Sequence, residues 1–134
     1  VTPETPWGGY AGFSCRLARS FRRPLITTSE GQLPASEAHG RPARWCDYSG
    51  RVDGFSDVWA GIAFFDHPQN PGFPSPMLTY DTEIQFLQVG FLYRRSHHVK
   101  KGEVLRLKYR AYVHDGKPGE GELASLWEAF ASER

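Results

Sequence analysis

The sequence lacks most of the features that identify a protein's chemistry. No apolar run approaches the ~18 residues that a membrane-spanning helix needs, so we expect no membrane association. Cys15 and Cys46 are the only cysteines, and without a Cys-x-x-Cys pair they predict free buried thiols rather than a zinc site. There is no nucleophile elbow, phosphate loop, dinucleotide fingerprint or His-Glu-x-x-His segment. We therefore predict no metal or cofactor and leave open whether the protein is an enzyme.

The net charge is small, but the charged residues are unevenly placed along the chain. Residues 52–93 contain no lysine or arginine, residues 94–117 contain eight with two acids, and residues 118–134 contain one with four acids. The net charge of +1 argues against a dedicated nucleic-acid binder. The basic block either attracts anions or acidic sugars or forms a solvated face. No signal peptide is visible, and Val1 is not a natural initiator. We therefore expect a chain that is processed, cut down or renumbered, and we predict no location.

What the sequence does contain is period-two alternation, which is typical of β-strands, over a length of 134 residues that fits one domain. Residues 58–65 are apolar on both faces, which predicts a central strand covered on each side. Residues 29–42 are predicted to be an exposed loop, and residues 66–76, with four prolines, to be irregular. The expected strands are 13–17, 25–28, 44–48, 58–65, 77–80, 84–87, 91–93 and 104–114.

The clearest alternation runs through residues 104–114. One face holds Leu105, Leu107, Tyr109, Ala111 and Val113, and the other holds Arg106, Lys108, Arg110, Tyr112 and His114. The cationic row is interpreted either as a concave face that binds carboxylates or phosphates or, preferably, as the wet face of an antiparallel sheet.

Only the C-terminus changes period. Leu123, Leu126, Trp127 and Phe130 follow helical spacing, which predicts one amphipathic helix over residues 118–131. The predicted fold is therefore all-β: a twisted antiparallel β-sandwich with one C-terminal amphipathic helix.

A proline-stiffened loop follows the most apolar strand, in the sequence Phe-Phe-Asp-His-Pro-Gln-Asn-Pro. It carries Asp66, His67 and Asn70, and a rigid loop at the end of a buried strand is where binding groups are often found. One interpretation is a ligand-binding site in which His67 titrates near neutrality and Asp66 orients a second group. The alternative is structural, with Asp66 capping the turn and His67 and Asn70 holding the loop by hydrogen bonds.

A second candidate group is Trp45, Asp47 and Tyr48 at the end of a strand. Aromatic rings beside a carboxylate suit sugar recognition, and the alternative is core packing with the polar tips satisfied. His97 and His98 could not share a metal ion on a strand, since adjacent strand residues face opposite sides. They are expected in an exposed loop before Lys100 and Lys101. His114 is interpreted as a strand end.

Several ordered blocks resemble one bacterial family, the PmoA-like proteins, whose label is borrowed from methane oxygenase. The blocks run from Trp7 to Ser14, from Asp47 to Gly50, from Gly61 to Pro71, from Pro74 to Pro76, and from Gly102 through Gly116. The resemblance implies a β-sandwich associated with sugar catabolism. It also implies that this chain matches the C-terminal half of a longer protein, without the His-rich segment of the N-terminal half.

These observations support two hypotheses. The first is a soluble β-sandwich domain of the PmoA-like family that binds or helps to process a carbohydrate through Asp66, His67, Asn70, Trp45, Asp47 and Tyr48. The second is a non-catalytic structural domain that pairs with a partner chain or with a second copy of itself.

Overall fold

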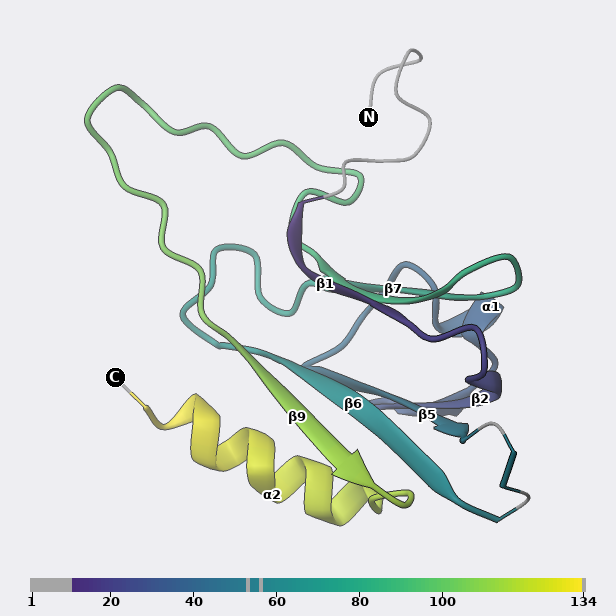
Figure 1. The fold of residues 1–134 in the computed structure, drawn as a ribbon. Coiled ribbons are helices and arrows are strands. Elements are labelled where there is room, and N and C mark those ends of the chain that lie inside the picture. The colour runs from purple at the N-terminus through teal and green to yellow at the C-terminus, as the bar shows by residue number, and fades with distance from the viewer. Residues whose placement is uncertain (1–10, 53, 56, 134) are drawn as a thin grey trace.

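Two antiparallel sheets face one another in the computed structural model, which describes residues 11–52, 54–55 and 57–133 (Figure 1). The four-stranded sheet has the order β1 (Gly12–Leu17), β8 (Gln85–Gly90), β7 (Pro76–Asp81) and β4 (Arg41–Pro42). The five-stranded sheet has the order β3 (Gly31–Leu33), β2 (Arg22–Thr28), β5 (Trp45–Arg51), β6 (Trp59–Asp66) and β9 (Tyr109–Asp115). The predicted all-β class is confirmed.

Two helices complete the described part of the chain. The short α1 (Ala35–Ala38) lies beside β7, and α2 (Glu120–Ala131) covers the outer face of the five-stranded sheet (Figure 1). The single amphipathic C-terminal helix is therefore confirmed. Among the described residues, no helix has the length and apolar character needed to cross a bilayer.

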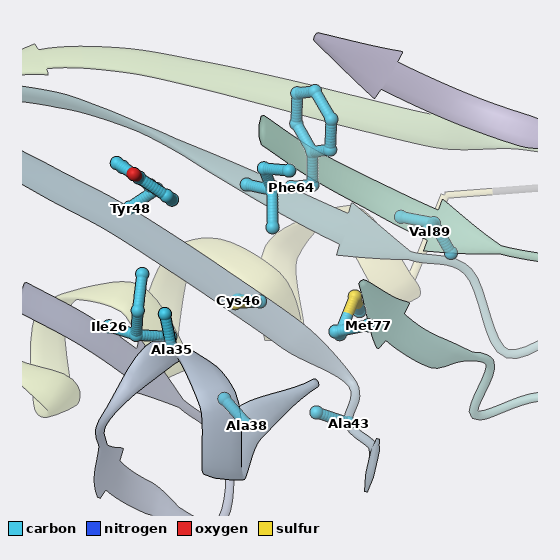
Figure 2. Close-up of a cluster of buried hydrophobic side chains, with 10 residues drawn as sticks. Ile26, Ala35, Ala38, Ala43, Cys46, Tyr48, Phe64, Met77 and Val89 are labelled. Atoms are coloured by element: carbon cyan, nitrogen blue, oxygen red, sulfur yellow. The ribbon is translucent and has the colours of Figure 1, made fainter. Parts of the chain in front are cut away.

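Strands β5 and β6 are buried on both faces, as their composition predicted for β6. One face of each contributes to the core between the sheets, where Tyr48 and Phe64 meet Met77 and Val89 (Figure 2). The opposite faces contribute to a second core under α2, made of Trp45, Ala63, Phe65, Leu123 and Phe130. Alternation along each strand thus sends successive side chains into two different cores.

Three predicted elements are wrong. The strand expected over residues 104–114 begins only at Tyr109, and residues 91–93 form a turn rather than a strand. The segment 29–42 is not an exposed loop, because it contains β3, α1 and β4. Ala35 and Ala38 of α1 are buried against the core between the sheets. Alanine and glycine made this segment look solvent-exposed, but small residues also allow a short helix to approach a core closely.

The prediction that the cationic face of β9 is exposed to solvent is also wrong. Tyr112 packs into the core under α2 and His114 is buried, whereas Val113, on the supposedly inward face, is 75% exposed. The reason is tertiary. The helix α2 covers the cationic face of β9, and the four-stranded sheet ends at β1, so that Val113 on the other face of β9 stays uncovered. Alternation identifies two faces of a strand but not which one is covered.

The two thiols are free, as predicted, and differ in burial. Burial raises the pKa of the half-buried Cys15 thiol to about 11, and that of the fully buried Cys46 thiol further still. Because the thiolate is the reactive form, we expect Cys15 to alkylate slowly at pH 8 and Cys46 to react only after unfolding. Mass spectrometry of native and urea-unfolded protein after iodoacetamide treatment measures this, and rapid double labelling of the native protein would contradict it.

Candidate functional site

The loop that follows β6, residues 67–75, is organised around the carboxylate of Asp66. This side chain is 0% exposed. Its Oδ1 accepts a hydrogen bond from Asn70 Nδ2 at 2.7 Å, and its Oδ2 accepts one from the backbone N–H of Ser75, also at 2.7 Å. A buried carboxylate is stable only when its oxygens are paired. Asp66 therefore ties the two ends of the proline-rich loop together.

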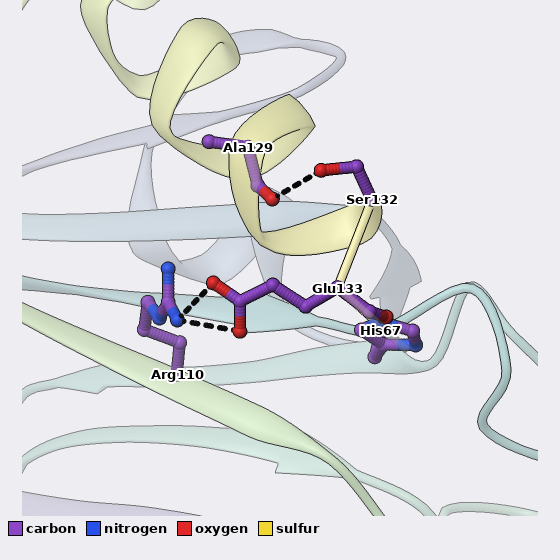
Figure 3. A network of polar contacts seen from close by, with 5 residues as sticks. All are labelled: His67, Arg110, Ala129, Ser132 and Glu133. Carbon is purple, nitrogen blue, oxygen red and sulfur yellow. Dashed lines mark hydrogen bonds and ion pairs between the residues drawn. The ribbon is translucent and has the colours of Figure 1, made fainter.

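His67 links the same loop to the residues that follow α2. Its Nδ1 accepts a hydrogen bond from the backbone N–H of Gln69, so the ring proton lies on Nε2, which donates to the carbonyl of Glu133 at 3.1 Å (Figure 3). The Glu133 carboxylate in turn pairs with Arg110 at 2.7 Å. The indole of Trp127 donates to the carbonyl of Asp66 at 2.9 Å. These contacts fix α2 against the sheet.

Asn70 holds the segment that leads into β9. Its Oδ1 accepts from the backbone N–H of Lys108 at 2.7 Å, and its Nδ2 donates to the Lys108 carbonyl at 2.6 Å. The ammonium group of Lys108 also reaches Gln69 Oε1 at 2.8 Å. A side-chain amide that pairs with both backbone groups of one residue acts like a neighbouring strand. The chain is thereby fixed immediately before β9.

Arg95 fixes the other end of that segment on the same loop. Its guanidinium donates to the carbonyls of Pro71 at 3.0 Å and Gly72 at 3.1 Å, and its Nε donates to the carbonyl of Phe91. Gly72 has a φ of +75°, and a Cβ at this position would collide with the guanidinium. Glycine is thus required here both for its backbone conformation and for the approach of Arg95.

Residues 96–107 lie between these two anchors, and we call this segment the arm. It leaves the sheets as a long excursion without helix or strand (Figure 1). Every residue from 96 to 106 is exposed, including Val104 at 76%, Val99 at 44% and Leu105 at 37%. Long structureless segments in compact domains are uncommon and often functional. His97 and His98 lie in this arm, as the prediction of an exposed loop stated.

A second polar network lies on the α2 side of the five-stranded sheet. His114 Nε2 and Asp47 Oδ1 are 2.7 Å apart, and Ser49 Oγ donates to Asp47 Oδ2 at 2.6 Å. The imidazole crosses from β9 to β5 over Gly61 of β6, where a Cβ would come within 2.8 Å of the ring. Burial raises the pKa of the Asp47 carboxyl, against the opposing effect of the hydrogen bonds from Ser49 and His114.

The six predicted site residues thus fall into two internal networks and two cores. Asp66, His67 and Asn70 share the first network and Asp47 lies in the second, while Trp45 and Tyr48 point into opposite cores. The contacts of Asp66, His67 and Asn70 are those of the structural alternative, with hydrogen bonds that hold the loop. No three His, Cys, Asp or Glu side chains among the described residues are grouped as a metal site would require.

Sequence reasoning missed Ser49, Arg95 and His114. His114 lies beside Asp47 only because β5, β6 and β9 pair in one register, which no local pattern reveals. Ser49 lies two residues from Asp47 on the same face of β5. Glycine at position 61 inside an apolar strand was the available signal, since it often marks a close approach. Nothing in the sequence around Arg95 indicated that it anchors the arm.

The architecture defines a β-sandwich domain with a helix on one face and an anchored, exposed arm. By sequence the chain belongs to the family DUF6807, described as a family of unknown function, whose model matches residues 2–128. No curated protein and no solved structure matches the chain. Nothing in these comparisons links it to the PmoA-like proteins, so that resemblance stays a prediction.

Proposed function

We propose that this chain is a non-catalytic structural domain that associates with a second copy of itself through the arm. The observation that carries the proposal is the stretch from residue 96 to 106, in which every residue is exposed and which the 67–75 loop holds at both ends. A segment with anchored ends loses less conformational entropy on binding than a free one. The anchoring therefore prepares the arm for a partner.

The chemistry of the arm favours an acidic surface. It exposes Lys100, Lys101 and Arg106 beside three apolar side chains, and Glu103 is its single acid. Exposed apolar groups next to unpaired charges of one sign are typical of interfaces between proteins.

The exposed side of α2 offers the complementary charge. Glu120, Glu122 and Glu128 are exposed there, and α2 contains no lysine or arginine. Among these three carboxylates, only that of Glu122 has a hydrogen bond or ion pair within the described part of the chain, a hydrogen bond from Tyr112. A two-fold dimer would place the arm of each copy on α2 of the other, so that both contacts form twice.

The six predicted ligand-binding residues are between 0 and 4% exposed. This burial favours structural roles for them, with Asp66, His67 and Asn70 supporting the arm and α2. The proposal therefore gives the loop that stands out in the sequence a part in assembly.

Charge reversal tests the proposal. Sedimentation velocity over a wide range of concentrations should show a reversible dimer that weakens as salt rises, because exposed charges are screened beyond ~8 Å at physiological ionic strength. The arm variant Lys100→Glu with Lys101→Glu, and the helix variant Glu120→Lys with Glu128→Lys, should each be monomeric. Mixing the two variants should restore a dimer, because each interface of the mixed pair again joins opposite charges.

An exposed acid elsewhere provides the control. Glu37→Lys, in α1 beside β7, changes the net charge by the same amount per site as one helix substitution and should leave the dimer intact. A wild-type chain that is monomeric at every concentration, or a dimer that survives both reversals, would rule the proposal out.

A further inference from the structure

A polar cleft opens at the end of the sandwich where the β7–β8 turn approaches the residues before and within β2. It has a volume of about 580 Å³ and is lined by Arg19, Arg23, Asp81, Thr82, Glu83 and Gln85. It is separate from both polar networks and from the arm. Every lining side chain carries a hydrogen-bonding group, which is unusual because small-molecule sites are mostly apolar.

The cleft is balanced in charge. It contains two guanidinium groups and two carboxylates, and none of the four forms an ion pair with another described residue. Both carboxylates would repel an anionic ligand, and both guanidinium groups would repel a cationic one. A neutral ligand with many hydroxyls can use all four, since hydroxyls donate to carboxylates and accept from guanidinium groups.

One lining group lacks a partner although it is buried. Gln85 is 6% exposed, and its Oε1 has no hydrogen bond in the structure. A buried amide oxygen without a partner is costly, and such atoms in native structures call for an explanation. Gln85 lines the cleft, and a turn of its side-chain amide toward the cleft would bring Oε1 within reach of a ligand hydroxyl and supply the missing bond.

The backbone beside the cleft is irregular in a way that places a second lining group. The pairing of β2 with β5 shifts register between Arg22 and Leu25, and Arg23 has a φ of +52°. A non-glycine residue with positive φ is uncommon, and bulges often redirect a side chain beside a functional site.

A smaller, mostly apolar hollow adjoins the cleft. It has a volume of about 270 Å³ and shares Asp81 and Thr82 with the cleft. Its lining includes the rings of His39 and Tyr80, whose centroids are 4.6 Å apart. Aromatic rings beside hydroxyl-binding groups suit a ligand that is polar at its edge and apolar on its C–H faces.

We propose that the cleft binds a neutral, polyhydroxylated small molecule built on a sugar ring, with its hydroxyls on the charged groups and Gln85. The site uses none of the residues that the sequence suggested for a carbohydrate. It is also independent of dimer formation through the arm.

Saturation-transfer NMR titrations with matched sugars test this site. The probes are glucose, galactose and mannose, each compared with its uronate and its 2-amino derivative. At least one neutral hexose should bind saturably and about tenfold more tightly than its two charged relatives, because each charge opposes one pair of lining groups. Absence of saturable binding by all three hexoses, or tighter binding of a uronate, would overturn the proposal.

The variant Glu83→Gln sharpens the test, because Glu83 is exposed and its replacement keeps the shape of the side chain. It leaves the cleft with a net positive charge, so hexose binding should weaken about tenfold while the uronate gains affinity. Asp115→Asn, which removes an exposed carboxylate outside the lining set, should change neither. Equal effects of the two variants would show that the binding lies elsewhere and would also overturn the proposal.

Discussion

Asp66→Ala is expected to lower the free energy of unfolding by about 3–5 kcal/mol. The substitution leaves the Asn70 amide and the Ser75 N–H without acceptors, and each unpaired buried donor costs about 1–3 kcal/mol. Asn70 also loses the contact that orients it toward Lys108. For a chain of this size the midpoint of thermal unfolding should fall by roughly 10–20 °C.

Urea unfolding followed by tryptophan fluorescence measures this effect. Asp115→Ala is the matched control, because Asp115 also ends a strand but is exposed, and it should change the free energy of unfolding by less than about 0.5 kcal/mol. Asp66→Asn retains an acceptor for one of the two donors, so its free energy of unfolding should lie between those of Asp66→Ala and Asp115→Ala. A stability of Asp66→Ala within about 1 kcal/mol of the wild type would contradict the assigned role of the carboxylate.

Asp47→Ala should cost about 2–4 kcal/mol, somewhat less than Asp66→Ala. The substitution leaves the Ser49 hydroxyl and the His114 Nε2 without their partner, and the Nδ1 of His114 already lacks one. The loss of stability is partly offset, because the substitution also removes a carboxylate whose charged form is disfavoured by burial. The same urea measurement applies, and the double variant Asp47→Ala with His114→Ala should cost less than the sum of the single changes.

The ionisation of Asp47 also predicts a pH dependence. Burial raises the pKa of its carboxyl above the ordinary 3.8, so the folded state holds this proton more tightly than the unfolded state. Its contribution to stability is therefore complete below pH 3.8 and is lost as the pH rises through the native pKa. Relative to Asp47→Asn, which does not ionise, the wild type should lose stability as the pH rises from 3.5 to 7. A relative gain would reverse the assigned direction.

Much of the fold could be predicted because it depends on local pattern. Alternation identified β1, a run of apolar residues identified β6, and helical spacing identified α2. The exposure of β9 could not be predicted, since it depends on where the opposite sheet ends and where α2 lies. The helix α1 was missed because four residues are too few for a periodic signal.

The candidate site was predictable only in part, for a related reason. The chain order Asp66, His67, Asn70 made the loop stand out, and its residues do share one network. Their partners, Ser75, Lys108 and Glu133, are mostly backbone groups that carry no signal of residue type. Arg95 and His114 reach their networks across strands and turns, so only the three-dimensional structure brings them there.

The most direct test of the account compares Arg95→Ala with Arg94→Ala in sedimentation velocity. Both variants remove one positive charge at the base of the arm, but only Arg95 donates to the carbonyls of Pro71 and Gly72, whereas Arg94 lies over the ring of Tyr93. If the loop holds the arm for a second copy, Arg95→Ala should weaken the dimer while the protein stays folded, and Arg94→Ala should not. Equal dimerisation of the two variants, or a wild type that never dimerises, would contradict the account.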